Sequence, residues 1–407
     1  MRIVLFYQSI LSDWNHGNAH FLRGVAGELL ARGHEVRVYE PRDSWSLTNL
    51  LSSCGSAPLR EVLRVYPWLR STRYDLATLD IDRALDGADL VIVHEWNDHA
   101  LVRRIGEYRA RAGGFMLLFH DTHHRSVSEP ESMAAYDLSH YDGVLAFGEV
   151  IRNLYLSRCW TARAWTWHEA ADTRLFRPVP APVQEGDLVW IGNWGDGERT
   201  SELYEFILEP ARALGLRARM YGVRYPEEAA AMLHQTGIDC AGWLPNHAVP
   251  QVFARFNVTV HVPRRPYVEA LPGIPTIRPF EALACGIPLV CSPWDDAEGL
   301  FNPGEDFLVA RNGREMERHL GALLQDAEMR RELAEHGRQT ILRRHTCGHR
   351  VDELFAIVEA LGGEHRGALP SRGTPQPDER DRRESEEGEK GEKKAFPLSY
   401  SERTGPL

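Results

Sequence analysis

The sequence lacks the long apolar runs that mark a membrane-spanning or secreted chain. Its longest apolar runs, at 90–93 and 115–119, have the length of single strands, whereas a transmembrane helix needs about 20 consecutive apolar residues. The apolar run at 3–7 meets polar residues at once, which is not the pattern of a signal peptide. These absences predict a cytoplasmic protein, and peripheral association with a membrane surface stays open.

Patterned cysteines and an excess of positive charge are also missing. The six cysteines form no C-x-x-C pair and no zinc-like spacing, which predicts reduced and mostly buried thiols. The chain has 47 Lys and Arg against 58 Asp and Glu, a formal net charge of −11. Because nucleic-acid binding depends on clustered Lys and Arg, no nucleic-acid partner is expected.

Several motifs of other enzyme classes are absent. No G-x-G-x-x-G follows the first apolar run, and neither a Walker A lysine motif nor a G-x-S-x-G elbow occurs. Asp80 and Asp82 match a metal-binding D-x-D motif only superficially, because a helix is expected there. A metal site built from His120, with His94, Glu95 and His99, would be the rival interpretation of that cluster, but its spacing matches no recognised motif. We therefore predict no metal ligands.

What is present is an alternation of short apolar runs with amphipathic stretches, which is typical of parallel sheets built from βα units. The length of 407 residues fits two domains of roughly 150 to 200 residues each. Strands are expected at 2–7, 36–39, 90–93, 115–119 and 143–147, and again at 188–191, 218–221, 258–262, 289–291 and 307–310. The stretch 44–80 is predicted to be a helical insertion.

The βα pattern restarts at residue 188, and the Pro-rich segment 176–182 before it predicts a hinge. We expect a first domain at 1–175, a second at 187–345, and a disordered charged tail at 367–407. Two doubly wound lobes bind ligands in the crevice outside the carboxyl ends of their strands.

The segment 273–290 carries the most chemical information. Pro275, Thr276 and Ile277 lead into a short helix, whose free backbone N–H groups can hold a diphosphate. Glu281 lies in the first turns of this otherwise apolar helix, where a carboxylate can accept both ribose hydroxyls. An ordinary helix-to-strand turn would explain Gly286 but not Glu281.

This segment resembles the signature of the retaining glycosyltransferases called glycosyl transferases group 1, especially their spore-maturation CgeB-like branch. The segments 300–304 and 345–354 are similar to that branch as well. The resemblance implies an α/β GT-B fold, in which two Rossmann-like doubly wound domains face a cleft, with a helix at 346–364 returning to the first domain. It also implies a nucleotide-sugar donor, a UDP-sugar or GDP-sugar, and retention of configuration with no required cofactor or metal. The acceptor, whether a glycan, a lipid or a small molecule, is left undetermined.

The resemblance also suggests site residues in the first domain. Gly17 and Asn18 match a Gly-containing turn that approaches phosphate or acceptor. His120 resembles the histidine beside the reacting sugar, and Asp121 would orient His120 or receive an acceptor proton. Asp172 would fasten the crossing between the domains.

In the second domain, Arg199 stands where the family carries a basic phosphate clamp. Arg224 and Arg265 are further candidates, the latter in a cluster with Arg264 and Arg278 around the donor loop. The family usually has a further Glu at the position of Gly273, and Glu269 is a candidate replacement. Two alternatives to sugar transfer stay open: a nucleotide-sugar epimerase on the same fold, and a non-catalytic scaffold protein that retains it.

Overall fold

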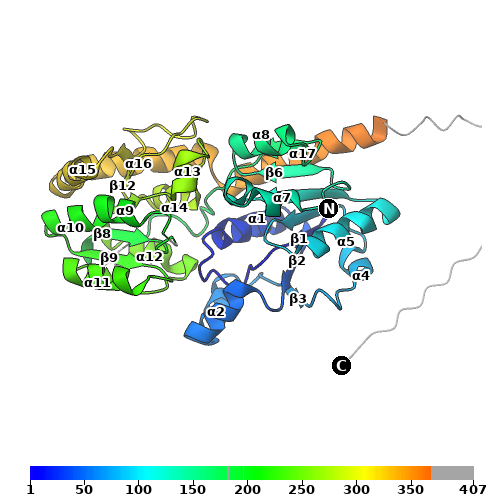
Figure 1. Cartoon of the computed structure of the whole chain (residues 1–407), viewed down its shortest axis with the longest axis horizontal. Coiled ribbons are helices and arrows are strands. Elements are labelled where there is room, and N and C mark those ends of the chain that lie inside the picture. The colour runs from blue at the N-terminus through cyan, green and yellow to red at the C-terminus, as the bar shows by residue number, and fades with distance from the viewer. Residues whose placement is uncertain (181–182, 196, 368–407) are drawn as a thin grey trace, which may run out of the picture. The chain divides into compact units, whose positions relative to one another are not determined.

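The computed structural model describes residues 1–180, 183–195 and 197–367. Residues Met1–Gly363 form one compact unit, and within it the chain builds two parallel sheets, each flanked by helices (Figure 1). The predicted α/β architecture of two Rossmann-like lobes is confirmed. The predicted tail lies, from residue 368 on, outside the described residues, and the domain limits 1–175, 187–345 and 346–364 stay a prediction.

The first sheet places the carboxyl ends of its central strands side by side. Its order is β3-β2-β1-β4-β5-β6-β7, and all pairs are parallel. The connections change direction at β1, which pairs with both β2 and β4, so the loops after β1 and β4 flank a crevice. The strands are β1 (Arg2–Phe6), β2 (Glu35–Pro41), β3 (Thr72–Tyr74), β4 (Leu90–His94), β5 (Met116–Asp121), β6 (Gly143–Ala146) and β7 (Ala164–Thr166).

The second sheet repeats this arrangement. Its order is β10-β9-β8-β11-β12-β13, again all parallel. The change of direction falls at β8, which pairs with β9 and β11, so a second crevice opens at the carboxyl end of this sheet. The strands are β8 (Gly186–Ile191), β9 (Ala218–Tyr221), β10 (Asp239–Cys240), β11 (Phe256–His261), β12 (Leu289–Cys291) and β13 (Leu308–Val309).

The helices cover the sheets (Figure 1). Those of the first lobe are α1 (Ala19–Ala31), α2 (Trp45–Cys54), α3 (Ala57–Val65), α4 (Ile81–Leu85), α5 (His99–Ala112), α6 (Arg125–Ser128), α7 (Pro130–Ala134) and α8 (Glu149–Ser157). The following segment contains α9 (Thr200–Leu203), a π-helical turn (Tyr204–Leu208), α10 (Glu209–Ala213), α11 (Glu227–Thr236), a 3₁₀ turn (Asn246–Ala248), α12 (Val249–Phe253), α13 (Arg265–Glu269), α14 (Ile277–Cys285), α15 (Gly313–Gln325), α16 (Ala327–Arg344) and α17 (Cys347–Gly367).

One apolar core cluster joins the two lobes. It contains Phe21 and Val25 of α1, Phe280 of α14, and Val351 and Leu354 of α17. The chain crosses between the sheets twice, and the two crossings lie side by side where Ala171 pairs with Thr346. The shared core fixes the starts of α1 and α14 against each other.

The structure corrects the sequence analysis for the strands and the cysteines, and it agrees with the expectation for Asp80. The stretch 44–80 contains α2 and α3 but also the strand β3, and the strands β7 and β10 were not predicted. Half of the cysteines, Cys54, Cys159 and Cys240, are exposed rather than buried. Asp80 caps α4 by accepting a hydrogen bond from the backbone N–H of Arg83, as expected of a helical context.

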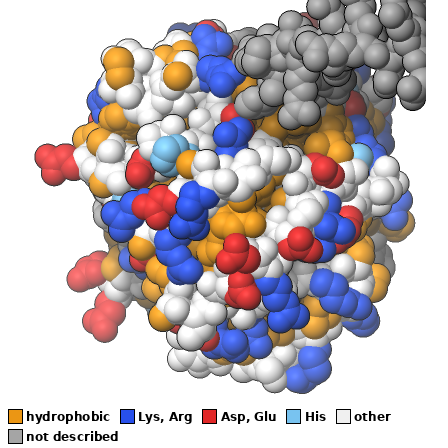
Figure 2. Space-filling model, turned by 90° about the vertical axis from the view of Figure 1, so that its right-hand side faces the viewer, with side chains coloured by type: hydrophobic (Ala, Val, Ile, Leu, Met, Phe, Trp, Pro, Cys, Tyr) orange, Lys and Arg blue, Asp and Glu red, His pale blue; other side chains and the backbone are white. Residues whose placement is uncertain are grey.

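The surface mixes charges of both signs. On the face shown in Figure 2, Lys and Arg side chains are interspersed with Asp and Glu side chains around apolar patches. Of the helices in the described ranges, none combines the length and the hydropathy needed to cross a bilayer.

Candidate functional site

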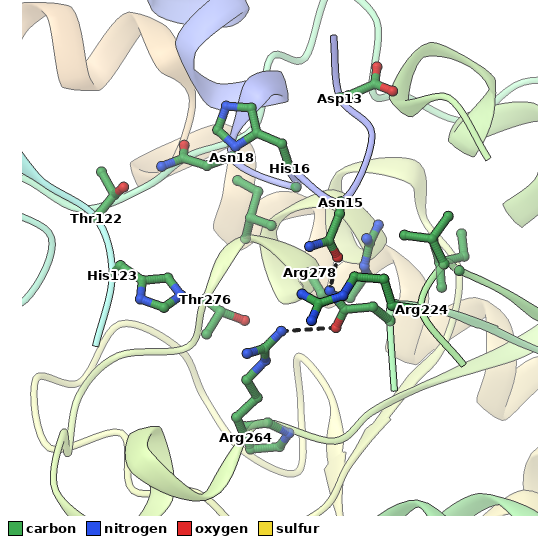
Figure 3. Close-up of a pocket in the computed structure, with 18 of the residues that line it drawn as sticks. Asp13, Asn15, His16, Asn18, Thr122, His123, Arg224, Arg264, Thr276 and Arg278 are labelled. Carbon is green, nitrogen blue, oxygen red and sulfur yellow. Dashed lines mark hydrogen bonds between the residues drawn. The ribbon is translucent and has the colours of Figure 1, made fainter. Parts of the chain in front are cut away.

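A cavity of about 600 Å³ lies between the two lobes (Figure 3). Most of its first-lobe wall comes from the loops that follow β1 and β5, and most of its second-lobe wall from the loops that follow β8, β9 and β11. It therefore occupies the crevice that the doubly wound topology predicts. Figure 3 shows Thr122 and His123 on one side of it and Arg224 on the other.

The start of α14 opens on this cavity. Thr276, Ile277 and Arg278 line the wall, whereas Pro275 is buried behind it. Thr276 has a φ of +59°, a strained backbone conformation that is rare for a β-branched residue. Gly17, before α1, lies so close that a Cβ there would be 3.3 Å from Ile277 Cγ2. The N-termini of α1 and α14 thus meet at one place, where both helix dipoles are positive.

Arginine side chains surround this meeting point. Half-buried Arg199 donates to the carbonyl oxygens of Asn193 (2.6 Å) and Val262 (2.7 Å). Burial, and after it the nearby Arg264, lowers the pKa of Arg199 to about 9. Arg264 pairs with Glu198 at 2.9 Å. These contacts hold both guanidinium groups in fixed positions on the second-lobe wall.

Arg278 is held by a hydrogen-bonded chain that joins the lobes. Its guanidinium donates to Oε2 of Glu281, and Oε1 of Glu281 lies 2.9 Å from Nδ1 of His20 in α1. The backbone N–H of Asp172 donates to Nε2 of His20 at 2.8 Å. Because Nε2 accepts, the proton of a neutral His20 ring is on Nδ1 and is donated to Glu281. Both side chains are fully buried, and Glu281 does not line the cavity, so its predicted contact with a ribose stays a prediction.

The other two predicted arginines differ in position. Arg224 lines the cavity, and its guanidinium lies 5.7 Å from the centre of the Trp45 ring of the first lobe. Arg265 does not line it, because its side chain pairs with Glu202 at 3.0 Å and donates to the carbonyl oxygen of Gly197. Its neighbour Arg264 lines the cavity instead.

His120 and Asp121 lie behind the cavity wall rather than in it. They are the last two residues of β5 and are fully buried. The His120 ring packs 4.8 Å from Trp167, and burial lowers its pKa to about 3. Asp121 accepts a hydrogen bond from the hydroxyl of Tyr155 at 3.0 Å, and burial raises its pKa to about 6.

The residues after β5 reach the cavity. Thr122, His123 and His124 line it, and burial lowers the pKa of both histidines. Among the described residues, Nδ1 of His123 and both side-chain amide atoms of Asn18 are buried without a hydrogen-bond partner. Since buried polar atoms are normally hydrogen-bonded, such atoms on a cavity wall indicate a ligand.

Two further features were missed in the sequence. Trp45 and Trp96 line the cavity although they remain 49% and 40% exposed. Glu169, in the first crossing, also lines it and is only 5% exposed. No periodic pattern or motif distinguishes these residues in the sequence.

The histidine cluster weighed as a metal site forms other contacts. Nε2 of His94 lies 2.9 Å from the Thr122 hydroxyl, and Nε2 of His99 lies 2.8 Å from the carbonyl oxygen of Ser132. In the part of the chain that the structure describes, no group of three or more His, Cys, Asp or Glu side chains is arranged to hold a metal ion.

Comparison with solved structures identifies this arrangement. HepE from Anabaena in complex with UDP-glucose superposes with a TM-score of 0.60 at 12% identity, covering 90% of this chain and 100% of that chain. An alpha-glucosyltransferase in complex with UDP-glucose and DNA containing an abasic site gives a TM-score of 0.65 at 12% identity (88% and 99% covered). Sucrose-phosphate synthase from Thermosynechococcus elongatus gives a TM-score of 0.57 at 15% identity, covering 90% of this chain and 98% of that chain. The chain has the GT-B fold.

The sequence comparison agrees with the GT-B assignment. Residues 199–356 match the model of a family described as glycosyl transferase-like. This segment contains Arg199, α14 and the start of α17, so it covers most of the second-lobe wall. A search by sequence among curated proteins gives no match.

Proposed function

We propose that this protein is a glycosyltransferase that binds a UDP-sugar or GDP-sugar in the interlobe cavity and transfers the sugar to an acceptor. We further propose retention of configuration, no required metal, and membership of the CgeB-like branch. The observation that carries the proposal is the convergence of the starts of α1 and α14 with Arg199, Arg264 and Arg278 on one cavity. Helix N-termini and guanidinium groups both bind phosphate.

The roles of the wall residues follow from their positions. The diphosphate would lie against Thr276–Arg278, where free N–H groups and the Arg278 guanidinium stabilise the charge that develops on the leaving group. The sugar would face Asn18 and His123, whose buried polar atoms have no partner among the described residues. We propose that Asp121 positions His123, because its carboxylate accepts a hydrogen bond from the backbone N–H of His123 at 3.1 Å.

Thermal unfolding in the presence of nucleotides tests the proposal. A ligand that binds only the folded state at 100 times its Kd stabilises the protein by about 2.7 kcal/mol. Heating the protein with UDP, GDP, UDP-glucose and GDP-mannose should therefore raise Tm for at least one base, with little effect from the matching nucleoside.

Arg278→Ala should weaken binding of the effective diphosphate by about 10-fold or more, because it removes a charged hydrogen-bond donor. Arg311→Ala, at a position 84% exposed, is the matched control and should bind like the wild type. No Tm shift with any nucleotide of the panel would contradict the proposed function.

A further inference from the structure

Three carboxyl groups lie around the start of α14, and each has different surroundings. Both carboxylate oxygens of Glu281 are hydrogen-bonded, one to Arg278 and one to His20, and Glu281 does not line the cavity. It is a positioning residue for Arg278.

Glu298 is also committed to the protein. Its Oε2 lies 3.0 Å from Nε2 of His168, and its Oε1 accepts the backbone N–H of Glu149 at the start of α8 at 2.8 Å. It covers Gly273 so closely that a Cβ there would lie 2.7 Å from its Cγ. Gly273, with a φ of +88°, therefore cannot be replaced by a carboxylate without displacing Glu298.

Glu169 is the carboxyl group that faces the cavity. It lines the wall and is 95% buried, yet its carboxyl group forms no hydrogen bond or ion pair with any residue of the described ranges. Its backbone is held, since its carbonyl oxygen accepts a hydrogen bond from Nε of Arg350. Because Glu169 lines the cavity and no described residue binds its carboxyl group, this group is available to a ligand.

The charged groups around Glu169 set its protonation. Burial, and then the charge of Glu281, raises its pKa to about 8, although Arg278 opposes the shift. Tyr267 of α13 also lies near it and is held neutral, because burial and the charge of Glu169 raise its pKa. At neutral pH the Glu169 carboxyl group is mostly protonated, so it offers both an O–H donor and an acceptor oxygen.

From this geometry we infer that Glu169 binds hydroxyl groups of the donor's sugar. A sugar hydroxyl both donates and accepts, which a protonated carboxyl group on the wall matches at both oxygens. The inference rests on the proposed function, since it needs a nucleotide sugar in the cavity. It assigns sugar selection to the crossing between the lobes rather than to the loop at Gly273.

Titration calorimetry with the full-length protein separates the sugar contact from the nucleotide contact. For the base selected by the thermal panel, Kd is measured for the nucleotide sugar and for the bare diphosphate. Glu169→Ala should weaken the nucleotide sugar by about 10-fold, because two hydrogen bonds are lost, and should leave the diphosphate unchanged. Glu169→Gln, which keeps a donor and an acceptor, should restore most of the sugar affinity. Glu298→Gln is the matched control and should change neither Kd.

Each outcome decides between the claims. If the wild type binds no nucleotide, the proposed function fails and the inference fails with it. If the wild type binds but Glu169→Ala loses no sugar affinity, the inference fails and the proposed function stands. Equal loss for the nucleotide sugar and the diphosphate also overturns the inference, because it would indicate a general distortion of the cavity.

Discussion

Burial controls the chemistry of individual polar residues around the cavity. His120 was predicted to lie beside the sugar, but its ring packs against Trp167. His123, three residues later, lines the cavity. His120 and Asp121 do lie at the carboxyl end of a strand, β5, because a polar run after an apolar run marks such an end. The sequence could not resolve the last residues of β5, since side-chain direction there depends on where the strand stops pairing.

Glu169 provides a test of residue-scale electrostatics that needs no nucleotide. Its pKa in the folded protein, about 8, lies above the unfolded value of about 4.3. The folded state therefore holds a proton that the unfolded state releases, and stability falls as pH rises between these two values. Between pH 5 and pH 8, we expect the free energy of unfolding of the wild type to fall by more than about 1 kcal/mol relative to that of Glu169→Gln.

Urea unfolding of both proteins at the two pH values measures this difference. If the difference in the free energy of unfolding between the wild type and the variant is the same at both pH values, the Glu169 carboxyl group is not buried as described.

At the scale of elements, the central strands and the helix after Thr276 could be predicted, whereas β3, β7 and β10 could not. The central strands are buried on both faces and appear as apolar runs. β3 and β10 lie at sheet edges, and both residues of β10 and two of the three in β3 are exposed. Such strands carry no apolar run and are fixed only by pairing with β2 and β9.

The pairing of α1 with α14 is a second element-scale feature with a measurable consequence. His20→Leu leaves buried Glu281 without one of its two partners, and we expect it to lower the free energy of unfolding by about 2 kcal/mol. Because the two residues act as one unit, the costs of His20→Leu and Glu281→Gln should not add in the double variant.

The control is His168→Leu, which removes a different contact to a carboxylate, that of Glu298. The loss of unfolding free energy caused by His168→Leu should add to the loss caused by Glu281→Gln in the double variant. Additive costs for the His20 and Glu281 pair, measured by the same urea titrations, would mean that the hydrogen bond between the helices contributes nothing to stability.

Across the whole molecule, the two lobes provide complementary parts of one site. The first lobe supplies Asn18, Thr122 and His123, and the second supplies the start of α14 with Arg199 and Arg264. Local patterns predicted the two doubly wound lobes and the α14 segment, and the family resemblance implied the GT-B fold. Glu169, Trp45 and Trp96 line the cavity because of how the lobes face each other, and no local sequence pattern predicts that arrangement.

A crystal structure of the protein soaked with the nucleotide sugar selected by the thermal panel tests the central claim most directly. The account predicts the diphosphate against the backbone N–H groups at Ile277 and Arg278, with the sugar between His123 and Glu169. A diphosphate bound elsewhere, with the start of α14 left free, would contradict it.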